Sequence, residues 1–181
     1  MKFTPQSIPD VLLIEPTIHS DGRGYFTETF RQDLFEDAIG YKVNFIQDNE
    51  SKSTKGVLRG LHYQLLPYTQ AKLVRVIEGS VLDVAVDIRK SSPTFGQHVA
   101  VELTAQNKHQ LFAPHGFAHG FVVFSDSATF AYKVDNYYSP NHDRGIAFDD
   151  DQLKIDWQLS AEELQLSDKD KTHPSLANAK D

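Results

Sequence analysis

Residues 81–88, with the sequence VLDVAVDI, decide the fold class of this chain. Apolar and polar side chains alternate along them with a period of two, which is the pattern of a β-strand. Val84 and Val86 lie on one face of that strand. Asp83 and Asp87 lie on the opposite face. The chain therefore has at least one strand with two chemically different faces.

The β pattern continues on both sides of this strand, from residue 45 to residue 134. Residues that favour turns interrupt it at 78–79, 91–93, 105–107 and 114–116. Several short strands at this spacing predict a sandwich or a barrel, and a jelly roll is the most economical arrangement. We therefore expect a mainly β fold.

Shorter elements are expected in the N-terminal flank. Residues 11–15 and 24–29 have the composition of strands, with turn-forming residues between them. A short helix is expected at residues 33–39, capped by Asp33 and ended by Gly40.

The C-terminal flank is expected to carry only short helical turns, at residues 149–153 and from the capping-box pattern at 160–163. The 181 residues contain no internal repeat, low-complexity segment or linker. We therefore expect one domain over residues 1–181, in which both flanks pack on a jelly-roll core of about residues 45–135.

Composition excludes several classes of protein. Acidic residues outnumber basic ones by 25 to 18, a formal net charge of −7, so nucleic acid and anionic membranes are not expected as partners. The chain has no cysteine, which rules out disulfides and thiolate metal sites. Its first residues lack the apolar run of a signal peptide and no stretch approaches membrane-spanning length, so cytoplasmic residence is expected.

Lys72 is a polar residue in an apolar strand. On a regular strand it shares a face with Val74 and Val76, so its ammonium points into the core if those valines are core residues. In the alternative, Lys72 is solvated and Leu73 faces inward, but Arg75 then faces inward too. We favour the inward lysine, because a buried charge is costly unless it is paired or used.

Two histidines and a tyrosine are candidates for proton chemistry, and each also has a structural interpretation. His62 and Arg59 have opposite parity on a flat strand, so Gly60 between them is expected to mark a bulge that re-aims one of them. His119 lies near glycines, where backbone and ligand can approach closely. Tyr132 also fits a core tyrosine with one hydrogen-bond partner. Position in the sequence leaves both interpretations open.

A metal site is an alternative, because jelly-roll barrels often hold a metal through several histidines and a carboxylate. His62 and His119 are potential ligands, but the chain has no His-x-His pair, and Lys72 would place positive charge beside the ion. Divalent cations require neutral or anionic ligands. We therefore expect no metal, and no redox cofactor is expected without a dinucleotide-binding glycine motif.

Ordered motifs cover nearly the whole chain. They are DGRGYFTE at 21–28, QDN at 47–49, RGLHYQ at 59–64, KLVRV at 72–76, DVAVDIR at 83–89, SPTFG at 92–96, GFAHGF at 116–121, YK at 132–133, YY at 137–138 and DW at 156–157. In these motifs and in their order the chain resembles the dTDP-4-dehydrorhamnose 3,5-epimerase family.

The resemblance implies a cupin-type jelly roll without a metal, and a homodimer in which the N-terminal strands pack on the partner subunit. It implies cofactor-independent inversion of C3 and C5 in dTDP-4-dehydro-6-deoxy-D-glucose, which gives dTDP-4-dehydro-L-rhamnose. Relatives that invert a single carbon, or that use another nucleotide sugar, share these motifs. A metal-dependent cupin enzyme and a non-catalytic sugar-binding cupin are the more distant alternatives.

The resemblance also assigns catalytic roles. It implies that His62 is the general base, that Tyr132 is the general acid, and that Asp170 orients His62. Lys72 would lie at the C4 carbonyl oxygen. Imidazole suits a base because its unperturbed pKa lies near working pH, and a cation stabilises the enolate that forms when a proton α to a ketone is lost.

Substrate contacts are implied for a larger set. Arg23 and Arg59 would bind the diphosphate, since a guanidinium binds phosphate oxygens bidentately, and Tyr138 would stack on the thymine. The remaining implied contacts are polar or aromatic side chains: Phe26, Glu28, Gln47, Asn49, His119, Asp143 and Lys169. The chain departs from the family pattern at Ala71, where a glycine is common, and at Asp143, where a glutamate is common.

Overall fold

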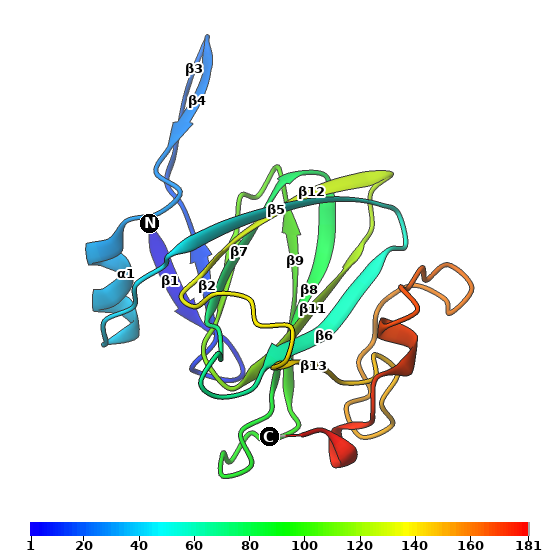
Figure 1. Cartoon of the computed structure of the whole chain (residues 1–181). Helices are drawn as coiled ribbons and strands as arrows, with labels where there is room; N and C mark the ends of the chain where they lie inside the picture. Colours follow the sequence, from blue (N-terminus) through cyan, green and yellow to red (C-terminus); the bar gives the residue numbers. More distant parts are fainter. Residues whose placement is uncertain (181) are drawn as a thin grey trace.

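The computed structural model describes residues 1–180 and is built mainly from antiparallel strands in two sheets (Figure 1). The six-stranded sheet contains, in spatial order, β1 (Lys2–Pro5), β2 (Leu12–Glu15), β10 (Gln110–Ala113), β7 (Lys72–Glu78), β12 (Ser127–Val134) and β5 (Gln47–Thr54). The five-stranded sheet contains β13 (Asp143–Gly145), β6 (Leu58–Gln64), β11 (Phe117–Val123), β8 (Ser80–Asp87) and β9 (His98–Thr104). The predicted mainly β fold is confirmed.

The two sheets enclose a common apolar interior. Strands β7, β10 and β12 of one sheet and β8, β9 and β11 of the other contribute to it. Phe121 and Phe130, on opposite sheets, stack with ring centroids 4.1 Å apart. Val74 and Val76 of β7 both lie in this interior. Lys72, which shares a face of β7 with Val74 and Val76, therefore points inward, as predicted.

Helix α1 (Gln32–Ile39) covers the outer face of the six-stranded sheet. Its Phe35 meets Phe112 of β10 edge to face, with ring centroids 4.9 Å apart. The predicted helix is confirmed, and Gly40 ends it with φ of 79°. The predicted cap is wrong: the helix begins at Gln32, and the Asp33 carboxylate pairs with Arg31 at 2.6 Å instead.

The C-terminal segment covers the outer face of the five-stranded sheet. Val84 and Val86 of β8 belong to the same apolar cluster as Leu153 and Trp157 of this segment. The apolar face of residues 81–88 therefore points outward and is buried there, while Asp83 points into the interior. The segment contains turns at 151–153 and 161–163 and two short 3-10 helices, η1 (Asp170–Thr172) and η2 (Leu176–Asn178).

Strands β3 (Ile18–Asp21) and β4 (Gly24–Thr27) form a hairpin that projects away from both sheets (Figure 1). Its aromatic residues Tyr25 and Phe26 are 60% and 66% exposed. Within the described residues, no helix is long and apolar enough to cross a membrane.

Candidate active site

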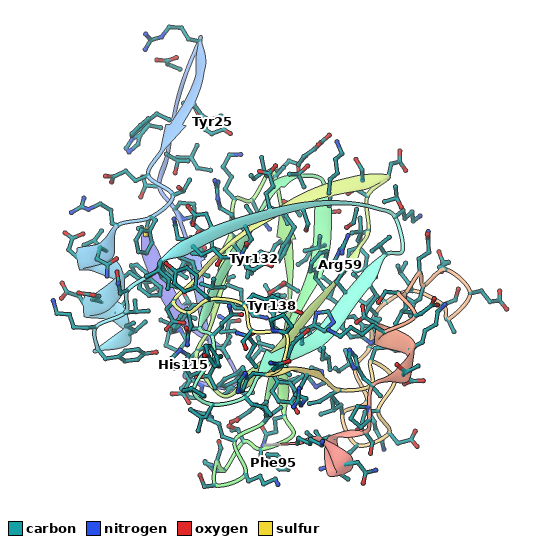
Figure 2. All side chains as sticks on the ribbon, in the orientation of Figure 1. Tyr25, Arg59, Phe95, His115, Tyr132 and Tyr138 are labelled. Carbon is teal, nitrogen blue, oxygen red and sulfur yellow. The ribbon has the colours of Figure 1, made fainter. Side chains whose placement is uncertain are left out.

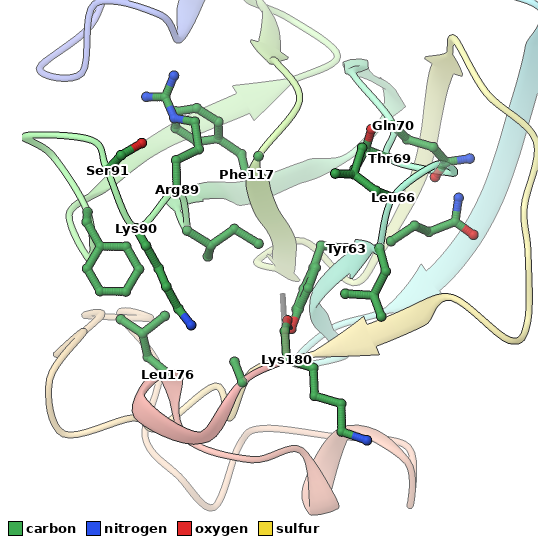
Figure 3. A pocket seen from close by; sticks show the side chains of 16 residues that line it. Tyr63, Leu66, Thr69, Gln70, Arg89, Lys90, Ser91, Phe117, Leu176 and Lys180 are labelled. Atoms are coloured by element: carbon green, nitrogen blue, oxygen red, sulfur yellow. Dashed lines mark hydrogen bonds between the residues drawn. The ribbon is translucent and has the colours of Figure 1, made fainter.

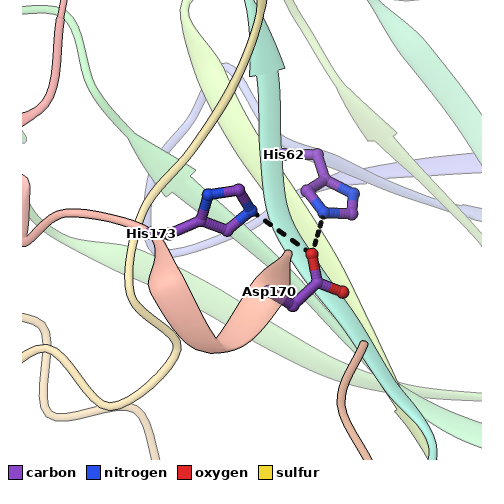
Figure 4. Close-up of side chains that lie close together, drawn as sticks. All are labelled: His62, Asp170 and His173. Carbon is purple, nitrogen blue, oxygen red and sulfur yellow. Dashed lines mark hydrogen bonds and ion pairs between the residues drawn. The ribbon is translucent and has the colours of Figure 1, made fainter. Parts of the chain in front are cut away.

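His62 of β6 is hydrogen-bonded to Asp170 of η1, with Nε2 2.6 Å from Oδ1 (Figure 4). Burial would raise the pKa of Asp170, but the hydrogen bond and charge of His62 hold it below its usual value. Because an ionised carboxylate only accepts hydrogen bonds, Nε2 of His62 carries the hydrogen. Nδ1 is then the ring nitrogen that can take a proton.

A bulge at Gly60 places both Arg59 and His62 on the inner face of β6, where Arg59 stays exposed to solvent. His119 and Phe121 of β11 pair with His62 and Arg59, so β6 has one extra residue over this interval. Gly60 has φ of +144°, and a Cβ atom there would lie 2.6 Å from a backbone atom of β11. The predicted bulge is confirmed, since only glycine fits this conformation and this approach.

Lys72 extends from β7 toward the opposite sheet. Its Nζ lies 3.5 Å from the backbone oxygen of His62. Burial lowers the pKa of Lys72 to about 8, and the negative charges of Asp143 and Asp83 oppose this shift. The ammonium is therefore held beside the His62 strand by the fold, in surroundings that strengthen its interaction with any anion.

Tyr132 of β12 lies on the same face as Lys72, because it pairs with Val74 two residues further along β7. Its ring is 6.1 Å from that of Phe130 in the interior. Burial raises the pKa of the Tyr132 phenol, with Arg59 opposing the shift. The phenol is therefore protonated at neutral pH and can donate, and it extends from the sheet opposite to that of His62.

A second histidine–carboxylate pair lies in the interior. Nε2 of His119 is 2.8 Å from Oδ1 of Asp83, and both side chains are buried. Among the described residues, Oδ2 of Asp83 has no hydrogen-bond partner. This role of Asp83 was not predicted from the sequence. The signal was its position on the polar face of residues 81–88, which turned out to be the inner face.

Other predicted substrate contacts gather at the edges of the barrel. Tyr138 donates a hydrogen bond to Oδ2 of Asp143 at 3.0 Å, and Nζ of Lys169 contacts the same oxygen. On β5, the amide of Gln47 donates to Asn49 at 2.7 Å. One set of polar contacts thus lies on β5, at the edge of the six-stranded sheet, and the other joins β13, at the edge of the five-stranded sheet, to the C-terminal segment. The assignment of these residues to substrate binding stays a prediction.

Three predicted contacts lie on or beside the projecting hairpin. The Arg23 side chain is 91% exposed and pairs with Asp21, Phe26 lies on β4, and Glu28 pairs with Arg31 at 3.5 Å. Figure 2 shows Tyr25 of the same hairpin far from the barrel residues Arg59 and Tyr132. Within one described chain, the hairpin residues are therefore not brought to His62.

One group of described side chains offers atoms that bind metals. His62, Asp170 and His173 place one potential ligand atom each within 4.8 Å of the others. However, Oδ1 of Asp170 already accepts the hydrogen bond from His62. This arrangement suits a hydrogen bond from imidazole to an ionised carboxylate better than convergence on an ion.

A cavity of about 400 Å³ lies at the end of β6, where Tyr63 and Gln64 line it (Figure 3). It is lined by mainly apolar side chains, among them Tyr63, Ile88, Phe95, Phe117 and Leu176. None of the described residues that line it is a predicted site residue. Tyr63 follows His62 on the strand and belongs to the outer apolar cluster, so this cavity is separate from the His62 site.

The chain is similar to known proteins over nearly its whole length. The chain matches the family model described as dTDP-4-dehydrorhamnose 3,5-epimerase over residues 5–178. It is 58% identical to the dTDP-4-dehydrorhamnose 3,5-epimerase of Shigella flexneri, over 94% of this chain and 93% of that protein. The crystal structure of dTDP-6-deoxy-D-glucose-3,5-epimerase from Legionella pneumophila Philadelphia 1, in complex with dTDP-4-keto-L-rhamnose, matches with a TM-score of 0.94 and 50% identity, over 98% of this chain and 93% of that one. ChmJ, a 3'-monoepimerase from Streptomyces bikiniensis in complex with dTDP-quinovose, matches with a TM-score of 0.88 and 36% identity, over 96% and 87% of the two chains.

Proposed function

The chain belongs to the dTDP-4-dehydrorhamnose 3,5-epimerase family, and on that premise we propose that it inverts C3 and C5 of dTDP-4-dehydro-6-deoxy-D-glucose through an enolate. The product is dTDP-4-dehydro-L-rhamnose. The observation that supports this most directly is the origin of the base and the acid from opposite sheets: His62 of β6 donates to Asp170 from Nε2, so that Nδ1 is its proton acceptor, and burial raises the pKa of the Tyr132 phenol on β12.

The proton steps follow from the chemistry of the substrate. The hydrogens on C3 and C5 are both α to the C4 ketone, so removal of either by Nδ1 of His62 gives an enolate. The negative charge develops on O4, where the ammonium of Lys72 stabilises it. The phenol of Tyr132 then protonates the same carbon from the other face of the ring, which inverts that centre. Proton exchange with water restores both side chains.

Cations are required to hold the substrate, because the chain as a whole is acidic, with a formal net charge of −7. Arg59 lies on the inner face of β6, where it donates to Ser53 at 3.1 Å. In the proposal Arg59 binds the diphosphate, Lys169 and Asp143 contact the sugar nucleotide, and Tyr138 stacks on the base. Such local cationic groups overcome the repulsion between the substrate diphosphate and the net negative charge of the chain.

The hairpin residues Arg23, Phe26 and Glu28 complete the site only if a second copy of the chain supplies them. We therefore infer a homodimer in which the exposed hairpin of each subunit reaches the barrel of its partner, as isologous two-fold symmetry allows. The exposure of Tyr25 and Phe26 supports this, because large aromatic side chains exposed on a projecting hairpin are typical of interaction sites.

Complementation between inactive variants tests the shared site. Arg23→Ala removes the hairpin contact and His62→Asn removes the base, so neither homodimer is active. An equal mixture should recover about one quarter of the wild-type rate, because half of the dimers are mixed and each of those holds one intact site. No recovery after subunit exchange, confirmed by mass spectrometry, would place the hairpin in its own subunit's site or in none.

The reaction itself is tested by NMR in deuterium oxide. Double inversion requires uptake of solvent deuterium at both C3 and C5, and His62→Asn should abolish it. Label at one carbon alone identifies a single-carbon epimerase, the alternative that the similarity to the ChmJ monoepimerase keeps open. Activity should survive chelation, since no step of the proposal uses a metal.

A further inference from the structure

A second imidazole lies against the carboxylate that orients His62 (Figure 4). Nε2 of His173 is 3.3 Å from Oδ1 of Asp170, the same oxygen that accepts the hydrogen bond from His62 at 2.6 Å. The two rings meet edge to face, with centroids 5.6 Å apart and an interplanar angle of 83°. The proposed base therefore belongs to a group of two imidazoles that share one carboxylate oxygen.

The fold makes room for the His173 ring. Its side chain is only 9% exposed and packs on the backbone of Gly145, where a Cβ atom would lie 2.3 Å from Nε2. Gly145 of β13 is the direct pairing partner of His62 on β6. The carbonyl of Pro174 accepts a hydrogen bond from Ala147 at 2.8 Å and fixes the segment to the end of β13. Glycine next to the base thus creates the site that His173 fills.

The electrostatics favour a neutral imidazole with its hydrogen on Nε2. Burial lowers the pKa of His173, and the charge of His62 lowers it further, while Asp170 opposes the shift. The charged groups that face the ring are His62 from β6 and Asp170 and Lys169 from the C-terminal segment. Among the described residues, Nε2 of His173 has no hydrogen-bond partner, so its 3.3 Å contact with Oδ1 of Asp170 is an electrostatic contact between a ring nitrogen and a carboxylate.

We propose that His173 is a positioning residue, which holds Oδ1 of Asp170 in line with Nε2 of His62 and thereby fixes the tautomer and orientation of the base. A neutral partner suits this role, because a second full positive charge would oppose protonation of His62 during turnover. The inference rests on the proposed function, since it concerns the base that this function assigns to His62.

Two substitutions distinguish the role of the His173 ring nitrogen from the role of the ring in packing. His173→Phe keeps an aromatic ring over Gly145 but has no N–H, and His173→Gln places an amide nitrogen near the position of Nε2 without titrating. We expect His173→Phe to lower kcat about tenfold with KM changed less than about twofold, because loss of alignment of a catalytic group slows turnover on this scale. His173→Gln should recover kcat to within about threefold of wild type. His98→Phe, on β9, is the matched control and should leave both constants unchanged.

Histidine tautomers are measured without turnover, by ¹⁵N NMR of histidine-labelled protein. In wild type, His62 should be a single tautomer protonated on Nε2, and in His173→Phe it should become a mixture. Wild-type kcat and an unchanged His62 tautomer in His173→Phe overturn the inference and leave His173 a packing residue. If wild type takes up no deuterium, the proposed function fails, and the tautomer measurement still tests His173. If His173→Phe does not unfold cooperatively, the comparison is made between wild type and His173→Gln, from the pH profile of kcat and the tautomer of His62.

Discussion

Replacing Lys72 by methionine is expected to slow turnover and to stabilise the fold at the same time. The ammonium lies inside the barrel, 3.5 Å from the backbone oxygen of His62. Two unit charges about 4 Å apart interact by about 4 kcal/mol at an effective dielectric constant of about 20, and each 1.36 kcal/mol or so changes a rate tenfold. Part of this interaction is already made with the ground-state ketone. We therefore expect kcat to fall about 10²–10³-fold, the scale of losing one oxyanion donor.

The effect on stability has the opposite sign. Burial lowers the pKa of Lys72 from 10.5 to about 8, and one pKa unit corresponds to about 1.4 kcal/mol, so the buried charge destabilises the folded state by about 3 kcal/mol below pH 8. Between pH 8 and 10.5 the unfolded chain binds more protons than the folded one, so wild-type stability rises over this interval. Lys72→Met should therefore raise the free energy of unfolding by about 3 kcal/mol at pH 7, with a gain that disappears toward pH 10.5.

Steady-state kinetics and urea unfolding at several pH values measure both effects. The matched control is Lys133→Met on β12, since Nζ of Lys133 contacts the exposed Asp48 at 2.8 Å on the outer face. This control should change neither kcat nor the pH dependence of stability. In wild type, kcat/KM should decline as pH rises through about 8, as Lys72 loses its proton. Unchanged kcat together with reduced stability in Lys72→Met would refute the reasoning, because the ammonium would then be neither near the ketone nor poorly solvated.

Three further substitutions test other parts of the site and fold. Tyr132→Phe should lower kcat by about 10²–10⁴-fold while nucleotide affinity measured by calorimetry stays the same, because only proton donation is lost. Asp170→Asn should lower kcat by about 10³–10⁴-fold, since an amide can donate to Nε2 of His62 and select the wrong tautomer, which ¹⁵N NMR detects. Hydrogen bonds led by that of Arg89 outweigh burial and lower the pKa of Asp87 to about 2. A shift of this size contributes about 2 kcal/mol at pH 7, which Asp87→Asn should remove without changing kcat. In wild type this contribution should be lost as pH falls from 3.8 to about 2 in acid-unfolding experiments.

Local rules predicted the strands but not their surroundings. The alternation in residues 81–88 indicates a strand with two faces, yet both faces are buried in the structure, because Trp157 and other residues distant in the sequence cover the outer one. Periodicity therefore could not show that Asp83 faces the interior. Likewise, Asp33 has the chemistry of a helix cap, but the guanidinium of Arg31 competes for its carboxylate and the helix begins earlier.

The same distinction applies to the site. The inward direction of Lys72 and the bulge at Gly60 follow from strand parity and from the conformational freedom of glycine, which are properties of a few neighbouring residues. Asp170 and His173 are three residues apart, the spacing that brings two side chains together on a 3-10 turn. Their position beside His62 depends on Gly145 of β13, which pairs with His62 and against which the His173 ring packs. Nothing within the C-terminal segment indicates that position, which becomes visible only when the pairing of β13 with β6 is known.

Catalysis and stability are coupled through the C-terminal segment. The proposed acid, base and cation lie on strands that are hydrogen-bonded within the two sheets, whereas Asp170 and His173 come from a segment held largely by the outer apolar cluster. Leu176 of that segment is 5% exposed, and its backbone N–H donates to Asp150 at 2.8 Å. Segments held by fewer backbone ladders open at lower free energy than the sheets they cover. Partial opening of the C-terminal segment therefore disturbs the orientation of His62 first, before the barrel itself unfolds.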